Sequence, residues 1–484
     1  MNKMKKFTGM LMLFASLTSK AQVGIGTTTP LARLHVTDSS VLFSVAGDIP
    51  TTPGNPPISG PGRRMMWYPD KSAFRVGFTD YQWDKSYIGN YSFACGSYTI
   101  AIGDRSTAMG FGTIANGIAS TALGNGSTSS GLNSTAMGDL TTSSGANSTA
   151  MGIQSMATGY AATAMGNNTK AFGNQSTAMG SLSGASGFAS TAMGFGTFAS
   201  GFASTAMGRG TNATGDTSVA MGFGTIASGN TSTAIGYQTS ASALASTAMG
   251  YKTTASGSAS TAMGSNTTAS GFNSVAIGSL VSTNGHEGAF FFGDDDPHMK
   301  GVRLSGVSNE LAARFNGGYY FITDDVGVDI GVRVQPGGNS WSAISDINRK
   351  ENFEPVDGNN FLDKIASFKL TSWNYKGQDA KTFRHYGPMA QEFYKAFGKD
   401  DYGIIGCDTL INQQDFLGVN LIAIQALEKR TAENKKENEI QDNTISELKK
   451  ENADFKIKND DFKKENDSLK ARLEKLEKIL AVKQ

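Results

Sequence analysis

Between residues 92 and 285 an apolar residue recurs every fourteen positions, preceded by alanine and followed by glycine. Seven residues after that glycine comes a second small position, which is alanine at 243 and glycine in the other units. Gly-, Ser- and Thr-rich tracts are often flexible linkers, but a register kept over fourteen units indicates a solenoid. The apolar column consists of Cys95, Met109, Leu123, Met137, Met151, Met165, Met179, Met193, Met207, Met221, Ile235, Met249, Met263 and Ile277.

Each unit predicts two short strands and two tight turns, because half a unit is too short for a helix and is punctuated by glycine. Alternation places Thr107 and Met109 on one face of a strand and Ala108 on the other. Stacked units form a parallel β-roll, roughly 65 Å long at ~4.8 Å per turn. We expect the large apolar column to form its thin core. The alanine face then meets a neighbouring chain, so several chains pack together.

The last unit carries a family pattern. Asn273-Ser274-Val275-Ala276-Ile277-Gly278 reads N-S-V-A-I-G, followed by small polar residues. In this pattern the repeats resemble the head domain of trimeric autotransporter adhesins, over about two-fifths of the chain. The resemblance implies a mostly β protein whose β-roll head repeats, residues 92–285, assemble as a homotrimer.

Residues 427–484 have the heptad pattern of a C-terminal trimeric coiled coil. Asparagine occupies three successive a positions, which costs stability but fixes register and oligomer state. The Lys- and Glu-rich outer face is ordinary solvation, and the helix is roughly 80 Å long at ~1.5 Å per residue. The apolar a and d residues are Ile445, Leu448, Phe455, Phe462, Leu469, Leu473, Leu476 and Leu480, and the asparagines are Asn452, Asn459 and Asn466.

Two further stretches flank the repeats. Residues 22–91 predict an N-terminal β-rich cap, whose aromatic side chains cover the end of the solenoid. A sugar-binding platform is the alternative role for those aromatics. Residues 286–340 predict a β-rich connecting neck, with short strands at 290–292 and 319–321. The cap aromatics are Trp67, Tyr68, Phe74, Phe78, Tyr81 and Trp83.

Residues 1–21 predict a secretory signal peptide. A lysine-rich start precedes an apolar run at 7–17 and a small-residue cleavage site ending at Ala21. That run is too short to span a membrane, so we expect an exported protein, extracellular or at the cell surface, without a transmembrane anchor in the mature chain.

Composition excludes several functions. A net charge of +1 argues against a nucleic-acid partner. The two cysteines, Cys95 and Cys407, lie in unrelated segments, and the four histidines lack metal-ligand spacing, so we expect no metal and no cofactor.

Three ordered blocks in residues 341–430 resemble the self-cleaving intramolecular chaperone of endosialidases and other tailspikes. They are the run 341–352, which contains S-D-x-x-x-K, then 385–392 and 418–423. The resemblance implies an α+β chaperone domain with a catalytic Ser345–Lys350 dyad and a scissile bond between Ile344 and Ser345. A serine hydroxyl needs an adjacent base, and a lysine serves when burial keeps it neutral. The alternative is a chaperone that no longer cuts.

These patterns predict a secreted or cell-surface trimeric fibre. Its roll contacts a host-surface or glycan ligand, and its chaperone drives assembly and cleaves itself once, in cis. The alternative is a tailspike-type glycan-degrading or glycan-binding enzyme. A glycosidase needs two opposed carboxylates. Between residues 103 and 285 the acidic residues are Asp104, Asp139 and Asp216, on different turns, so the roll lacks that pair.

Overall fold

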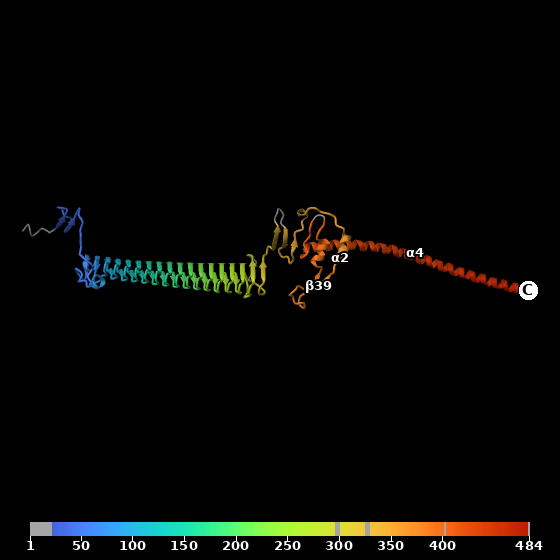
Figure 1. Ribbon diagram of the computed structural model, residues 1–484, viewed down its shortest axis with the longest axis horizontal. Helices are drawn as coiled ribbons and strands as arrows, with labels where there is room; N and C mark the ends of the chain where they lie inside the picture. Colours follow the sequence, from blue (N-terminus) through green and yellow to red (C-terminus); the bar gives the residue numbers. More distant parts are fainter. Residues whose placement is uncertain (1–21, 296–300, 325–329, 401–402, 483–484) are drawn as a thin grey trace, which may run out of the picture. The chain divides into compact units, whose positions relative to one another are not determined.

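The computed structural model describes residues 22–295, 301–324, 330–400 and 403–482 (Figure 1). The predicted signal peptide, residues 1–21, lies outside the described residues. The chain divides into one compact unit that ends at Asn316 and a second that begins at Gly317.

The first unit is a β-roll with one ladder of five-residue strands and one of two-residue strands. The five-residue strands of the repeats are β5 (Phe93–Ser97), β7 (Thr107–Phe111), β9 (Thr121–Asn125), β11 (Thr135–Asp139), β13 (Thr149–Ile153), β15 (Thr163–Asn167), β17 (Thr177–Ser181), β19 (Thr191–Phe195), β21 (Thr205–Arg209), β23 (Val219–Phe223), β25 (Thr233–Tyr237), β27 (Thr247–Tyr251), β29 (Thr261–Ser265) and β31 (Val275–Ser279). The two-residue strands are β6 (Ile100–Ala101), β8 (Ile114–Ala115), β10 (Thr128–Ser129), β12 (Thr142–Ser143), β14 (Met156–Ala157), β16 (Lys170–Ala171), β18 (Gly184–Ala185), β20 (Phe198–Ala199), β22 (Asn212–Ala213), β24 (Ile226–Ala227), β26 (Ser240–Ala241), β28 (Thr254–Ala255), β30 (Thr268–Ala269), β32 (Val281–Ser282) and β34 (Arg303–Leu304).

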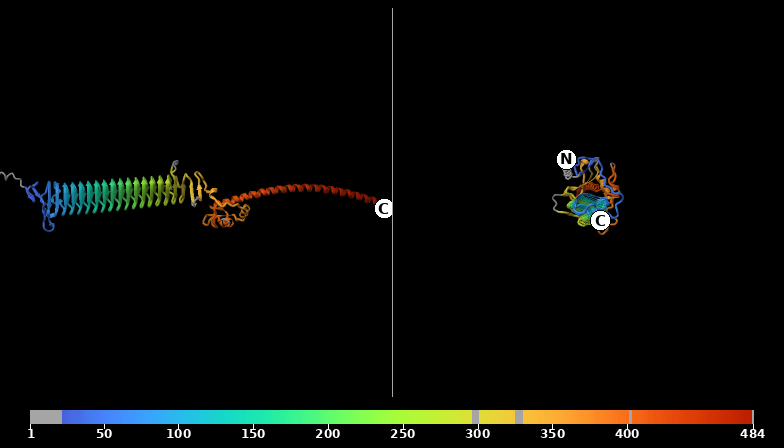
Figure 2. Two further views of the ribbon diagram at one scale, coloured as in Figure 1. Left: turned by 90° about the horizontal axis from the view of Figure 1, so that it is seen from above. Right: turned by 90° about the vertical axis from the view of Figure 1, so that its left-hand side faces the viewer.

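Strands one unit apart pair in parallel with like residues in register. Strands β11 and β13, for example, align Thr135 with Thr149 and Met137 with Met151. The successive rungs are seen edge-on in Figure 2. The parallel β-roll of fourteen-residue units predicted from the sequence is therefore confirmed.

Both glycine columns are required by the close stacking of turns. Gly138 has a φ of +133°, and a Cβ atom there would lie 1.9 Å from the carbonyl oxygen of Gly152 in the next turn. A Cβ atom on Gly145 would lie 2.0 Å from the Gly159 oxygen. A side chain at most of these positions would therefore meet the backbone of the next turn, although the second column holds alanine at 243 without loss of strand register.

The predicted contents of the core were wrong: alanine, not the large apolar column, lies inside. Ala136 is fully buried, whereas Met137 is 41% exposed. Serine and threonine fill the remaining interior. Some of their hydroxyls bond to the backbone, as Ser134 Oγ does by donating to Gly131 O at 2.7 Å, whereas others, such as that of Thr113, have no hydrogen-bond partner among the described residues. The alternation was right, but two short strands and tight turns enclose too narrow a space for methionine. The alanine face therefore cannot contact a neighbouring chain.

Larger residues end the alanine column on both sides. Strand β4 (Ala73–Thr79) pairs in parallel with β5 and places Arg75 beside Ala94. Strand β3 (Gly62–Tyr68) covers β4 as an antiparallel hairpin, through the 3₁₀ turn η1 (Pro69–Lys71). At the other end, Phe291 in β33 (Phe290–Gly293) takes the position next to Ala276.

The remaining elements of this unit are short. Strands β1 (Val23–Ile25) and β2 (Leu34–Val36) form a separate parallel pair, and η2 (Lys85–Tyr87) precedes the repeats. Strand β35 (Leu311–Arg314) extends the long ladder beyond β33, and Arg314 Nε pairs with Asp294 Oδ1 at 3.1 Å.

The second unit combines two small sheets with helices. Strands β36 (Tyr319–Asp324), β37 (Ile330–Val334) and β38 (Ser342–Ala343) form one antiparallel sheet, and β39 (Thr371–Trp373) with β40 (His385–Gly387) forms the other. The helical elements are η3 (Ile347–Arg349), α2 (Gly358–Ala366), α3 (Ala390–Phe397) and α4 (Gln413–Ala481). A core of Phe393, Phe397 and Val419 joins α3 to α4.

Helix α4 is continuous over 69 residues. Asn412 caps its start, where the side-chain oxygen accepts a hydrogen bond from Gln414 N. The sequence predicted a helix only from about residue 427, so the helix begins earlier than expected because its first turns pack on α2 and α3. Across the described part of the chain, no helix is both long and apolar enough to cross a membrane.

Candidate functional site

The structure brings the predicted dyad together. Lys350 Nζ donates a hydrogen bond of 2.7 Å to Ser345 Oγ. One turn of 3₁₀ helix, η3, lies between the two residues, and Lys350 N closes it by donating to Ile347 O at 3.2 Å. This turn explains the spacing of five, because it reverses the chain just enough for the two side chains to meet. Both side chains are exposed to solvent in the single chain.

A neighbouring carboxylate starts the same turn. Asp346 caps η3, and its Oδ1 accepts hydrogen bonds of 3.0 Å from the backbone and the side-chain nitrogen of Asn348. The aspartate of the S-D-x-x-x-K pattern therefore has a local structural role, which holds the turn that positions the dyad.

The bond before Ser345 follows directly on strand β38. Ala343 pairs with Val332 on β37, and the Trp341 ring packs on Phe321 with centroids 5.4 Å apart. These contacts hold the chain on the N-terminal side of the Ile344–Ser345 bond, while η3 holds the C-terminal side. A susceptible bond needs this kind of fixed position next to its nucleophile.

A cavity of about 700 Å³ opens beside the dyad. It is formed by the β36–β37 hairpin, the segment around the Ile344–Ser345 bond, and the first turn of α4. Its walls thus come from both sides of the predicted cleavage point. The lining residues are Thr323, Ile330, Gly331, Val332, Ser340, Trp341, Ala343, Ile344, Asp346, Arg349, Lys350, Asn412, Gln413, Gln414 and Leu417.

The other two sequence blocks build the domain around this site. The block 385–392 spans β40 and the first turn of α3, and its His385 ring stacks on Trp373 with centroids 4.7 Å apart. The block 418–423 lies in α4, where Val419 packs against Phe393 of α3. These residues support the fold rather than line the cavity.

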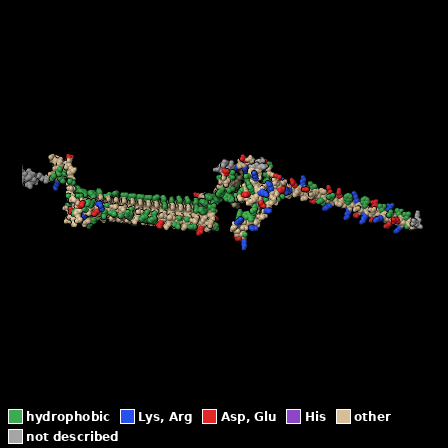
Figure 3. All heavy atoms as spheres, in the orientation of Figure 1, with side chains coloured by type: hydrophobic (Ala, Val, Ile, Leu, Met, Phe, Trp, Pro, Cys, Tyr) green, Lys and Arg blue, Asp and Glu red, His purple; other side chains and the backbone are tan. Residues whose placement is uncertain are grey.

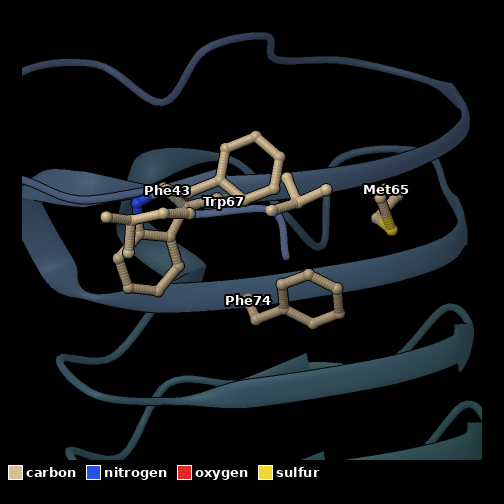
Figure 4. Close-up of a pocket in the computed structure, with 6 residues that line it drawn as sticks. Phe43, Met65, Trp67 and Phe74 are labelled. Atoms are coloured by element: carbon tan, nitrogen blue, oxygen red, sulfur yellow. The ribbon is translucent and has the colours of Figure 1, made fainter. Parts of the chain in front are cut away.

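The aromatic side chains of the N-terminal cap divide into two groups. Tyr68 and Trp83 are buried, and Trp83 Nε1 donates to Thr99 O at 2.9 Å, which suits the predicted capping role. Trp67 and Phe74 line an apolar pocket of about 430 Å³ with Phe43 (Figure 4).

The sequence reasoning missed one arrangement on the outside of the roll. Phe223, Tyr237 and Tyr251 occupy the position after the strand glycine in successive turns, and their rings stack on one another. Arg209 extends the stack to Phe195. The sequence feature that could have revealed this stack is the recurrence of aromatic residues every fourteen positions in this column.

Two family models match the chain, one in the repeats and one in the C-terminal domain. The model of the YadA head domain repeat matches residues 101–127, 129–155, 157–183, 199–225, 227–253 and 255–280. The model described as chaperone of endosialidase matches residues 345–401, starting at Ser345. No curated protein matches the chain. The protein therefore joins a β-roll of YadA-type head repeats to an endosialidase-type chaperone domain.

Proposed function

We propose that this protein is exported and forms a homotrimeric, adhesin-like fibre, extracellular or at the cell surface, assembled by its C-terminal chaperone domain. The observation that carries the proposal is the outward-facing apolar column of the roll. All fourteen of its positions are Cys, Met, Leu or Ile, although Met109 and Met137 are 40% and 41% exposed in the single chain. A continuous apolar stripe of this length is typical of a surface that packs against copies of itself.

The neighbouring column supports this assignment of faces. The neighbouring column is the position two residues after each apolar residue, and in two turns it is occupied by a charged residue, Asp139 or Arg209. Charged residues are depleted in the core of an interface. Apolar side chains run along the roll in Figure 3, with few charged ones among them. The two columns lie on the same face of the strands, so we place the apolar column toward the trimer axis and the neighbouring column at the solvent-facing rim of the interface.

Helix α4 supplies a second unpartnered stripe. Its apolar a and d residues, among them Leu448, Phe455 and Leu469, are 47% to 67% exposed. Leucine and phenylalanine at heptad spacing are buried when helices wind around each other, and three copies of α4 would cover them as a coiled coil. Asn452, Asn459 and Asn466 would then fix the register of the three chains.

The same assembly step explains how the dyad becomes active. A lysine acts as a base only when it is neutral, and burial favours the neutral form. Lys350 is exposed in the single chain, so we propose that trimerisation covers it. Neutral Lys350 then takes the proton of Ser345 Oγ as this oxygen attacks the Ile344 carbonyl carbon, and it returns the proton to the Ser345 nitrogen as the Ile344–Ser345 amide bond breaks. Water hydrolyses the resulting ester, which leaves a carboxylate on Ile344 and a free amino group on Ser345. Cleavage would follow assembly and release the chaperone from the finished fibre.

The competing function is a glycan-degrading tailspike. The three acidic residues of the roll have separate structural contacts: Asp104 accepts from Asn90 N at 3.0 Å, Asp139 from Asn125 Nδ2 at 2.5 Å, and Asp216 from Phe202 N at 3.0 Å. They bind backbone and amide groups of the preceding turn. This pattern favours a roll that contacts ligands without hydrolysing them.

The decisive experiment is mass measurement of the purified mature protein. Light scattering and denaturing mass spectrometry together report the oligomer and the covalent length of each chain. A trimer whose chains are cut before Ser345 is the expected result. A folded monomer at micromolar concentration would overturn the trimer, whereas an intact trimer would overturn only the self-cleavage.

A further inference from the structure

Five side chains on the outside of the roll form a continuous stack, here called the stacked ladder: Phe195, Arg209, Phe223, Tyr237 and Tyr251. Each lies in register with the next on adjacent strands. The rings of Phe223 and Tyr237 have centroids 5.0 Å apart and planes inclined by 6°, and those of Tyr237 and Tyr251 are 5.2 Å apart at 12°.

Arg209 bridges the gap between the aromatic residues of the ladder. Its guanidinium carbon lies 5.6 Å from the Phe195 ring centroid and 5.5 Å from that of Phe223. Attraction to the two rings holds the cation between them, while its N–H donors stay available for hydrogen bonds. Within the part of the chain that the structure describes, no carboxylate forms a salt bridge with Arg209.

The stacked ladder is open to solvent. Phe195 and Tyr251 are 49% and 44% exposed. In the first turns of the ladder, glycine follows the ladder residue in the sequence. A Cβ atom on Gly196 or Gly210 would meet nothing within 4 Å. The glycines therefore leave a clear shelf beside the rings.

The ring geometry leaves usable aromatic surface. Carbon atoms in face-to-face contact lie ~3.5–4 Å apart, so near-parallel rings with centroids 5.0 Å apart must be offset. An offset stack keeps part of each face uncovered along with the ring edges. The ladder thus repeats a flat apolar surface every turn, at ~4.8 Å.

We propose that the stacked ladder binds an acidic polysaccharide that lies along the roll. The C–H faces of sugar rings pack on aromatic faces, and the regular spacing suits a polymer of repeating units. Arg209 within the ladder and Lys252 at its end, whose Nζ lies 5.2 Å from the Tyr251 centroid, supply the positive charge for carboxylates. The proposal rests on the proposed fibre function, since it names the ligand class that the roll contacts.

The test uses the full-length protein and fluorescent polygalacturonate oligosaccharides, with their methyl esters as the uncharged counterpart. Phe223→Ala and Arg209→Gln should each weaken binding of the acidic form by about tenfold. Arg209→Gln should also narrow the difference between the acidic and the esterified ligand, because it removes the charge that distinguishes them.

Two matched variants serve as controls. Phe202→Ala removes an exposed ring that stacks on Phe188 in a different column, with centroids 5.3 Å apart, and Lys170→Gln removes an exposed cation on β16. Both should bind like the wild type. Circular dichroism and light scattering on the same samples report folding and trimer mass, so a failure of assembly is separated from a failure of binding.

Three outcomes would overturn the proposal. The first is wild-type protein that binds none of polygalacturonate, hyaluronan and heparin. The second is unchanged binding in both ladder variants. The third is wild-type protein that binds polyglutamate as tightly as polygalacturonate, together with a Phe223→Ala variant that keeps the full affinity for polyglutamate. That result would assign the stacked ladder to an acidic protein partner instead.

Discussion

Arg75 pairs in register with Ala94, so a guanidinium occupies the end of the column that alanine fills in the turns that follow. Its nitrogens donate to Ser92 O at 2.9 Å, Ser92 Oγ at 2.7 Å and Ala101 O at 3.1 Å. Burial lowers the pKa of Arg75 to about 10, which still leaves it charged at neutral pH. The side chain thus plugs the roll, and its charged donors add to the backbone hydrogen bonds that Phe74 N and Gly89 N already make to Ser92 O and Ala101 O.

Arg75→Met should therefore lower the free energy of unfolding by about 2–4 kcal/mol, because buried carbonyls lose charged donors. Chemical denaturation followed by circular dichroism measures the change. Arg63→Met, on an exposed position of β3, is the control and should stay within about 0.5 kcal/mol of wild type. Equal midpoints for the two variants would show that Arg75 is not the plug.

The assignment of faces in the roll predicts opposite effects for adjacent residues. Ala178 is fully buried, so Ala178→Leu should overpack the interior and cost about 1–3 kcal/mol or more of stability. Met179→Asp should leave the roll folded and weaken the trimer, since it places a charge in the proposed interface. Thermal melting and light scattering separate the two. Ser181→Asp, in the solvent-facing column, should change neither; a destabilised monomeric roll in Met179→Asp would contradict the assignment.

Cys95 offers a native probe of the proposed trimer axis. It lies in the apolar column, in register with Met109. In a Cys407→Ser background, a short bismaleimide should link Cys95 thiols of different chains into covalent dimers, seen on a denaturing gel. Moving the thiol to the solvent-facing column, with Cys95→Ser and Ser97→Cys, should abolish the linkage. Intact trimers that never cross-link through Cys95 would place the column away from the axis.

Self-cleavage should require both members of the dyad. Ser345→Ala and Lys350→Ala should each abolish processing, and the double variant should be no worse, because the two residues act as one unit. Mass spectrometry of wild type should find a fragment of residues 345–484 with the N-terminus Ser-Asp-Ile-Asn. Ser342→Ala, an exposed serine on β38, is the control and should process normally.

The timing of cleavage can be tested separately. A chain that ends at Ala426 keeps the buried residues of α4, which are Val419, Ala423 and Ala426, and lacks the predicted coiled coil, so it should process slowly. Wild-type trimers that remain uncut for days would show that the domain is retained as structure. The trimer proposal would stand in that case.

The sequence by itself determined the parts of this protein that repeat. The fourteen-residue period and its glycines require a parallel roll, because only glycine lets Gly138 approach Gly152 so closely. The heptads predicted a long C-terminal helix, and the spacing of Ser345 and Lys350, read through a family resemblance, pointed to two residues that the structure brings within 2.7 Å.

Only the tertiary structure decided which face of each strand is inside. Hydrophobicity alone predicted that Met137, not Ala136, lies inside the roll. The space enclosed by two short strands and their turns admits alanine and excludes methionine. The same holds for Arg75 and Phe291, whose roles follow from their place at the ends of the column. Interior volume depends on how turns stack in three dimensions, and no local pattern of residues contains it.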